Sequence, residues 1–283
     1  MRKLVSLMML MVILLSFSIS TYATPALSIE NNNTVRDLGN LNKEQINYLI
    51  DSTTDYATIT QYLDAEYLFN FAIRVKNKNP KKTENDIDRI LKEEVLKIGY
   101  DLEIFKLDGM GNMVLYRDDE VQPYSYGDLP IIRNKLGPNE KKVFNESLFK
   151  GLGVLSAGKF AMDNYERYYN SSVDDNGDAF RHGVWMAYSA FNSGADYARR
   201  FGIAHEDDFP NTALDRKMDL YNNDQGIQIS KKIYGNTPPD IVPDIVLGLV
   251  DKGVKNGDFR RFRGPDIGIL TYLVKTNNKG ARK

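Results

Sequence analysis

The sequence has no cysteine, only two histidines and a single tryptophan. The lack of cysteine excludes disulfide bonds, thiol nucleophiles and zinc sites built on thiolates. A chain without such cross-links is held by its hydrophobic core, and 283 residues are enough to build one. Because imidazole is the side chain that titrates near neutral pH, a mechanism that needs it there must use His182 or His205.

Two common enzyme signatures and a basic excess are also missing. HExxH does not occur, which excludes the standard metalloprotease pattern. The GxSxG serine elbow is absent too, since GLGVLS at 151–156 does not match it. The formal net charge of −1 provides no basic excess for binding a phosphate backbone, so we expect no nucleic-acid partner.

The N-terminus has the three-part layout of a cleavable secretory signal peptide. Arg2 and Lys3 form a positive start, an apolar stretch follows over 4–19, and Thr21 and Ala23 place small residues at a cleavage site. The alternative is a retained membrane anchor, but about 16 apolar residues fall short of the roughly 20 that a spanning helix needs. We therefore predict a signal peptide at 1–23 and a secreted or cell-surface bacterial protein without a later transmembrane segment.

Apolar residues at helical spacing predict a mainly α protein. Residues 24–40 are polar and rich in asparagine, as in a flexible leader. A smaller helical region is expected at 41–130, with helices over 41–76 and 83–99. Asp108 and Gly109 lie between two apolar runs and predict one β-hairpin in this region, the only plausible one in the chain.

The rest of the chain is predicted to be a helical domain at 131–257 and a basic, frayed tail at 258–283. Pro138 is tolerated in the first turn of a helix and marks the start of the domain's first helix. Further helices are expected over 144–169, 178–192, 195–204, 214–234 and 241–255. Helices joined by such short loops can pack side by side around a shared polar site.

The first motif lies at the start of the helix expected over 178–192. Asp178, Arg181, His182 and Trp185 share one helix face at i, i+3, i+4 and i+7. Asp178 is placed to hydrogen-bond His182, which fixes the tautomer of an imidazole and raises its basicity, as a general base or metal ligand requires. Alternatively, Asp178 caps the helix N-terminus, and Trp185 belongs to the core.

The second motif places His205 at a helix end, directly before Glu206 and two further acids. This histidine is either a second catalytic or metal-binding imidazole, or a cation that interacts with the C-terminal carbonyls of its helix.

In the third motif, Asp219, Asn222, Asn223 and Gly226 form one stripe on a helix. Amide side chains are seldom chosen for a helix interior, so the stripe indicates either a buried polar site that grips a ligand or an exposed face.

The three motifs together resemble an uncharacterised bacterial domain family whose members are secreted or attached to toxin-like and cell-wall-associated proteins. The resemblance covers about 136–257 and rests on DAFRH at 178–182 with Trp185, AHE at 204–206 and MDLYNN at 218–223. The family usually has asparagine where this chain has Met186, and the departure counts against activity if that amide binds substrate. More distantly, FRHxxW is similar to helical lipid-associated domains of the prokaryotic Wnt-like, or lipocone, type. That similarity implies a polar site acting on lipid or phosphoester head groups.

The residues favour a secreted hydrolase or transferase that acts on a phosphoester or lipid-linked envelope substrate, as an effector or in envelope remodelling. In this hypothesis His182 is a general base tuned by Asp178, and Arg181 holds an anionic group. His205 with Glu206 supplies the general acid or a second base. The remaining polar residues, Asp219, Asn222 and Asn223, with Trp185 as a possible ligand platform, bind the substrate or a divalent ion. A zinc variant would use His182, His205 and Asp219.

The alternative is a non-catalytic secreted module that binds the cell wall or a partner protein. The His/Asp/Asn network would then be a satisfied polar core, and the many tyrosines would serve surface recognition. A signal-dependent regulator or inhibitor is a third possibility. Loss of activity in a folded His182→Ala variant separates the enzyme from the module, because a structural histidine would change stability instead.

Overall fold

The computed structural model describes residues 43–102, 104–108, 112–115, 136–171, 173–209, 212–233, 237–263 and 272–278. The expected signal peptide, the leader at 24–40 and the boundary near residue 130 lie outside the described residues. Within the described part, helices dominate and the strands are short, which confirms the mainly α class.

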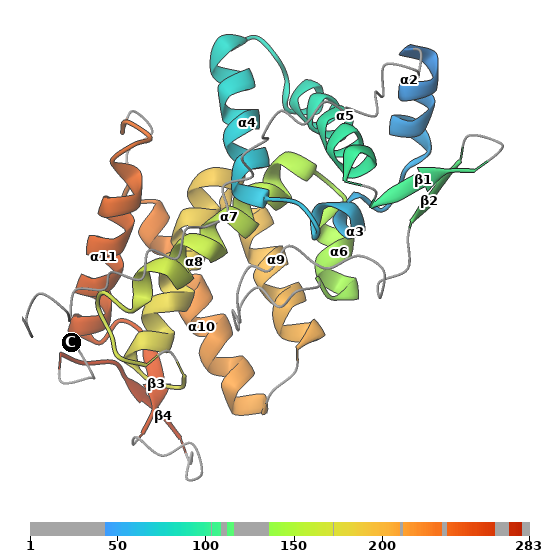
Figure 1. Ribbon diagram of the computed structural model, residues 1–283. Helices are drawn as coiled ribbons and strands as arrows, with labels where there is room; N and C mark the ends of the chain where they lie inside the picture. Colours follow the sequence, from blue (N-terminus) through green and yellow to red (C-terminus); the bar gives the residue numbers. More distant parts are fainter. Residues whose placement is uncertain are drawn as a thin grey trace, which may run out of the picture. The chain divides into compact units, whose positions relative to one another are not determined.

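The described residues form ten helices and two antiparallel strand pairs (Figure 1). The helices are α2 (Lys43–Ser52), α3 (Tyr56–Thr60), α4 (Ala65–Lys78), α5 (Glu84–Asp101), α6 (Pro138–Phe144), α7 (Leu148–Tyr165), α8 (Asn176–Ser193), α9 (Ala195–Asp208), α10 (Ala213–Ser230) and α11 (Val242–Asn256). The strands are β1 (Phe105–Leu107), β2 (Met113–Leu115), β3 (Arg260–Phe262) and β4 (Leu273–Lys275).

The helical segment expected over 41–76 is divided into three helices by aspartate caps. Asp55 accepts a hydrogen bond from the Thr58 backbone at 3.1 Å and so begins α3. Asp64 accepts one from the Tyr67 backbone at 2.9 Å and begins α4. Side chains that satisfy the free N–H groups of a helix start compete with continuation of the preceding helix.

Both strand pairs are hairpins, and only the first was expected. β1 and β2 pair with Phe105 opposite Leu115, as the Asp108-Gly109 signal predicts. β3 and β4 pair with Arg260 opposite Lys275, so the prediction of a frayed tail is wrong for this segment. Phe259 and Phe262 explain the order, because both side chains are almost completely buried.

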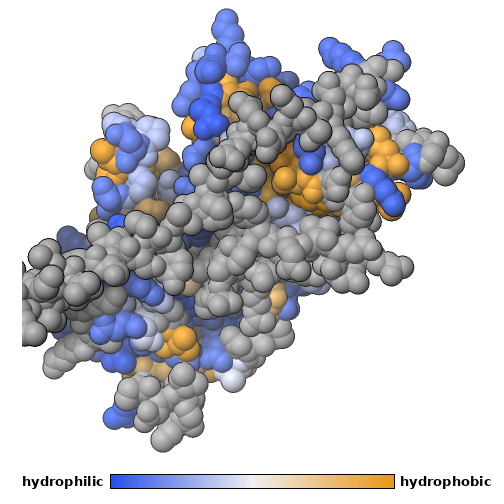
Figure 2. Space-filling model, in the orientation of Figure 1, coloured by the Kyte–Doolittle hydropathy of each residue, from blue (hydrophilic) through white to orange (hydrophobic). Residues whose placement is uncertain are grey.

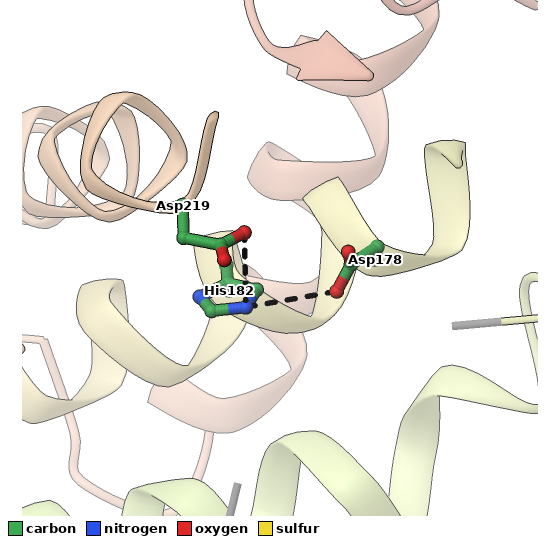
Figure 3. A group of neighbouring side chains, drawn as sticks. All are labelled: Asp178, His182 and Asp219. Atoms are coloured by element: carbon green, nitrogen blue, oxygen red, sulfur yellow. Dashed lines mark ion pairs between the residues drawn. The ribbon is translucent and has the colours of Figure 1, made fainter. Parts of the chain in front are cut away.

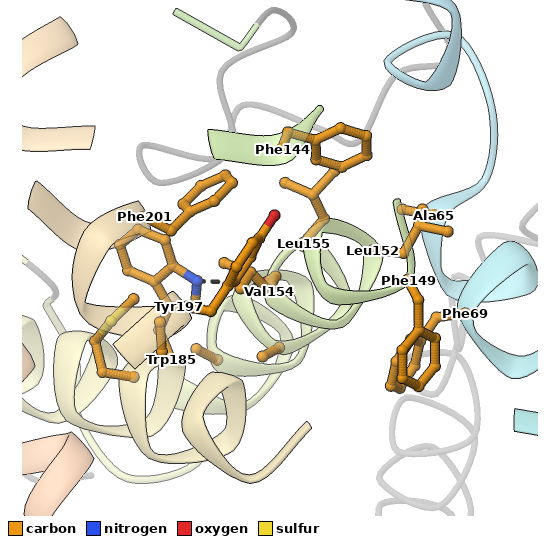
Figure 4. Close-up of a cluster of buried hydrophobic side chains, with 14 of the residues drawn as sticks. Ala65, Phe69, Phe144, Phe149, Leu152, Val154, Leu155, Trp185, Tyr197 and Phe201 are labelled. Atoms are coloured by element: carbon orange, nitrogen blue, oxygen red, sulfur yellow. Dashed lines mark hydrogen bonds between the residues drawn. The ribbon is translucent and has the colours of Figure 1, made fainter. Parts of the chain in front are cut away.

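Helix α8 is the centre of the motif-bearing region and packs against α7, α9, α10, α11 and β3. Figure 4 shows the core that surrounds it, with Trp185 of α8 between Val154 of α7 and Phe201 of α9. Because neighbours surround α8, its polar residues are buried along with its apolar ones. Burial of Asp, Arg and His side chains at a helix start costs free energy of desolvation, so stability alone does not explain their presence in a core.

Helices from both sides of residue 130 share one core. α4 and α5 pack on α7, and the rings of Phe69 and Phe149 stack with centroids 5.6 Å apart. All described residues belong to one compact unit, which includes the described helices of the expected N-terminal region at 41–130.

Polar side chains cover much of the visible described surface, with smaller hydrophobic areas between them (Figure 2). None of the helices in the described ranges has the length and apolar character needed to cross a bilayer.

The contact between α8 and α10 requires glycine at position 226. A Cβ there would lie 2.5 Å from the Gly183 carbonyl oxygen and 3.0 Å from the Met186 Cβ. We expect Gly226→Ala to lower the free energy of unfolding by about 2–3 kcal/mol, because backbone must move to admit the methyl group. Gly248→Ala in α11 is the matched control, since nothing lies within 4 Å of its Cβ position. Urea denaturation should show the control unchanged or stabilised by about 0.5–1 kcal/mol; equal behaviour of the two variants would contradict the packing account.

Candidate functional site

At the start of α8, the N-cap residue is Asp175 and not Asp178. Asp175 is the N-cap and accepts from the backbones of Gly177 at 2.7 Å and Asp178 at 3.1 Å. Asp178 uses its Oδ2 to accept from the Asp174 backbone at 2.9 Å, which ties the preceding turn to the helix. The alternative in which Asp178 is the N-cap is therefore wrong, and its Oδ1 faces Arg181 and His182.

His182 is oriented by Asn223 of α10. Its Nδ1 lies 2.9 Å from Asn223 Oδ1, so we assign the ring proton to Nδ1, which donates to the amide oxygen. Nε2 then keeps its lone pair and faces Asp178 Oδ1 at 3.6 Å and Asp219 Oδ1 at 3.4 Å (Figure 3). The expected hydrogen bond between Asp178 and His182 is not formed, because Asp178 Oδ1 and His182 Nε2 are 3.6 Å apart, which is too far. Asn223 fixes the tautomer in its place.

Burial determines the protonation of this imidazole. It lowers the pKa of His182 to about 4, and the Arg181 guanidinium acts in the same direction. Arg181 Nη2 bonds to Asp178 Oδ1 and also lies 3.3 Å from His182 Nε2. A neutral imidazole at physiological pH is a base or a metal ligand, not an anion-binding cation.

Two further carboxylates are buried without full satisfaction. Burial, followed by the charge of Asp178, raises the pKa of Asp219 well above its ordinary value. Burial likewise raises the pKa of Glu206 to about 7. Asp219 Oδ1 and Glu206 Oε1 have no hydrogen-bond donor among the residues that the structure describes. Native proteins leave few such groups, and those that exist tend to mark sites where a ligand or a reaction completes them.

His205 of α9 forms the second half of the cluster through a residue that the motifs did not include. Its Nδ1 lies 2.7 Å from Glu140 Oε1, and Glu140 Oε2 accepts from the Gly137 backbone at 2.8 Å. Asp208, at the end of α9, accepts from the Glu140 backbone at 2.8 Å and so fixes the start of α6 beside His205. The alternative in which His205 serves only the helix carbonyls is therefore replaced by a buried imidazole–carboxylate pair.

Glu140 was missed because it is 65 residues away from His205 in the sequence. Its visible role, a glutamate in the first turn after Pro138, is ordinary for a helix start. Pairing across such a separation follows from packing of α6 on α9, which no local pattern encodes.

Two residues expected to bind substrate have structural roles. The Trp185 indole is 2 % exposed and donates from Nε1 to the Val154 carbonyl at 3.2 Å. The centroid of its ring lies 6.2 Å from that of the His182 ring and 5.1 Å from that of the His205 ring, so the indole packs against both imidazoles. Asn222 exchanges two hydrogen bonds with the Arg260 backbone, at 2.9 Å and 3.0 Å, and attaches β3 to α10. The structure therefore gives Trp185 and Asn222 positioning roles in place of the expected ligand-binding roles.

The cluster reaches the surface only at its edge. Arg181 and His205 each keep 7 % of their surface exposed and Asp219 keeps 6 %, whereas Asn222 keeps none. The cluster is therefore shielded from bulk water, and charges interact more strongly in such a buried site than they do in water.

A protein-family model described as Domain of unknown function (DUF6973) matches residues 141–254. The matched stretch contains α7 to α10 and all three sequence motifs, and Glu140 lies just before it. No curated protein and no solved structure matches the chain.

Glu206 makes stability depend on pH in a defined direction. Its folded pKa of about 7 exceeds the ordinary 4.5, so the folded state holds a proton that the unfolded state releases. This contribution to stability is present below pH 4.5 and is lost as the pH rises through 7. Glu206→Gln does not titrate at this position. As the pH rises between these limits in metal-free buffer, we expect the free energy of unfolding of this variant to gain up to roughly 3 kcal/mol relative to that of the wild type. Urea denaturation across the pH range measures the difference; a constant offset between the two proteins would contradict it.

Proposed function

We propose that this chain is a secreted bacterial hydrolase or transferase that acts on a phosphoester, with lipid-linked phosphoesters of the envelope as its substrate class. The observation that carries the proposal is the buried His205–Glu140 pair set beside Arg181 and two unsatisfied carboxylates. A polar core selected for stability would satisfy its groups, whereas this cluster leaves donors and acceptors open.

The His205–Glu140 pair has the arrangement of a general base. Glu140 accepts from Nδ1 and thereby holds the ring with Nε2 free to take a proton. A buried carboxylate behind an imidazole also stabilises the imidazolium that forms when the proton is taken. We assign the role of general base to His205 and the role of positioning residue to Glu140.

Arg181 supplies the complement to a phosphoryl group. Its guanidinium is buried, and its Nε has no acceptor within the described ranges. A desolvated guanidinium with an open N–H suits a phosphoryl oxygen, which Arg recognises through parallel hydrogen bonds. The same group would stabilise the charge that develops on the equatorial oxygens during transfer.

Glu206 fits the general acid. Its pKa of about 7 keeps a large fraction protonated at neutral pH, which donation to a leaving oxygen requires. In the proposed step His205 takes the proton of water or of an acceptor hydroxyl as the new P–O bond forms. The bond to the leaving oxygen breaks, and Glu206 delivers a proton to that oxygen.

The test is turnover of defined esters by the purified protein. We expect release of p-nitrophenol from bis(p-nitrophenyl) phosphate or of head group from phosphatidylglycerol vesicles, with competitive inhibition by inorganic phosphate. p-Nitrophenyl acetate, a carboxylic ester without the phosphoryl charge, is the matched control and should be a poor substrate. Absence of turnover on both phosphoesters, with or without added divalent cations, would favour the non-catalytic binding module.

A further inference from the structure

We infer that Asp178, His182 and Asp219 form a three-ligand site for a divalent transition-metal ion such as Zn²⁺ or Mn²⁺. This set differs from the one suggested by the motifs, since His205 is engaged by Glu140 and Asp178 takes its place. A role of the ion in turnover rests on the proposed function, whereas the binding of the ion does not.

The spacing of the donor atoms fits one ion. His182 Nε2 lies 3.4 Å from Asp219 Oδ1 and 3.6 Å from Asp178 Oδ1, and one donor atom from each residue lies within 4.8 Å of the others (Figure 3). Two ligands about 2.1 Å from one metal at a tetrahedral angle are roughly 3.4 Å apart. Small side-chain rotations therefore bring all three atoms into bonding range.

The imidazole is held in the form that binds metal. Asn223 occupies Nδ1 through the 2.9 Å contact and leaves the Nε2 lone pair directed between the two aspartates. A hydrogen-bonded partner on the other ring nitrogen is the usual outer support of a metal-bound histidine. One nitrogen and two carboxylate oxygens suit Zn²⁺ or Mn²⁺ better than Ca²⁺, which prefers oxygen alone.

The unsatisfied oxygen is the independent indication of a ligand. Asp219 is 6 % exposed, and no donor in the described part of the chain reaches its Oδ1, which points at His182 Nε2. The two atoms face each other at 3.4 Å without a hydrogen bond between them, and a cation placed between them would bond to both.

Arg181 competes with the ion. Its Nη2 bonds to Asp178 Oδ1 and lies 3.3 Å from His182 Nε2, which are two of the proposed ligand atoms. Metal binding must displace the guanidinium, and removal of this like charge must strengthen metal binding. The displaced guanidinium is then available to a phosphoryl oxygen, which links the ion to the anion-binding role proposed for Arg181. When bound, such an ion lowers the pKa of a coordinated water and polarises a phosphoryl oxygen.

Isothermal titration calorimetry of the EDTA-treated protein with Zn²⁺ and Mn²⁺ tests the site. We expect one equivalent to bind the wild type, about 100-fold or more loss of affinity in Asp219→Asn, and tighter binding in Arg181→Gln. Asp224→Asn is the matched control, because Asp224 is a half-exposed acid on the same helix that pairs with Arg199. The gain in Arg181→Gln keeps the test valid if Asp219→Asn folds poorly, since a damaged fold does not bind more tightly.

The outcomes separate the two proposals. Failure of the wild type to bind either ion, weaker binding in an Arg181→Gln protein that circular dichroism shows to be folded, or equal losses in Asp219→Asn and Asp224→Asn overturns the metal site. Binding with the expected pattern but no phosphoester turnover retains the metal site and refutes the proposed function. Turnover that persists unchanged in EDTA retains the acid–base proposal and overturns the role of the metal in turnover.

Discussion

Replacement of His205 with alanine is expected to lower the rate of phosphoester turnover by about 10²–10⁴-fold, the usual contribution of a general base. Within the buried cluster that the structure describes, His205 is the imidazole that Glu140 holds through Nδ1. Without it, water or the acceptor hydroxyl has no base. Steady-state kinetics on bis(p-nitrophenyl) phosphate measure the change, and circular dichroism confirms that the variant is folded. Turnover within a few-fold of the wild type would contradict the assignment.

Glu140→Gln distinguishes a positioning role from a structural one. Glutamine has a single acceptor oxygen, so it can keep the hydrogen bond from His205 Nδ1 or the one from the Gly137 backbone but not both, and it removes the negative charge. We expect a smaller loss of turnover than in His205→Ala, seen in kcat and not in KM, because glutamine cannot stabilise the imidazolium that forms when the ring takes a proton. A variant that merely packed poorly would lower the folded fraction, and its activity per folded molecule would match that of the wild type.

Arg181→Met should cause the largest loss of stability in the cluster, about 3–5 kcal/mol at neutral pH in EDTA. Arg181 is the buried cation that faces Asp178, Asp219 and Glu206. Methionine fills a similar volume but leaves these carboxylates without a positive charge in a site shielded from water. Addition of Zn²⁺ or Mn²⁺ is expected to restore more stability to this variant than to the wild type, because the ion then supplies the missing charge.

Arg199→Met provides the comparison on the protein surface. Arg199 pairs with Asp224 at 3.0 Å, and the two side chains are 40 % and 56 % exposed. Exposed pairs contribute little, so we expect a change below about 1 kcal/mol. Urea denaturation of both variants gives the result; an Arg181→Met protein that unfolds within 1 kcal/mol of the control would mean that the carboxylates are already neutralised by other means.

The sequence was sufficient for the features that local periodicity encodes. The helical class and the stripe that carries Asp178, Arg181 and His182 follow from i, i+3 and i+4 spacing, and the structure buries these residues on α8. The polar stripe of α10 predicts either a ligand-binding face or an exposed one; it is buried, and Asn223 hydrogen-bonds to His182. These predictions succeed because they depend on one helix at a time.

The remaining features depend on contacts between distant segments. Glu140 meets His205 only because Asp208 fixes the start of α6 against the end of α9. Asn222 appeared suited to a ligand, but its partner is the backbone of Arg260, in a tail without a clear strand pattern. Amide groups bind backbone and ligands through the same atoms, so residue type cannot tell the two apart.

We propose that the cluster is maintained for function at the expense of stability, and Asp219→Asn tests this most directly. Asparagine has the same shape but carries no charge, so it removes a buried carboxylate whose pKa burial has raised. Urea denaturation of the EDTA-treated variant at pH 8 should show a free energy of unfolding about 1–2 kcal/mol higher than that of the wild type. Phosphoester turnover, assayed with divalent cation, should be lost. A variant that is destabilised and still as active as the wild type would show that Asp219 belongs to a structural polar core, and the account would be wrong.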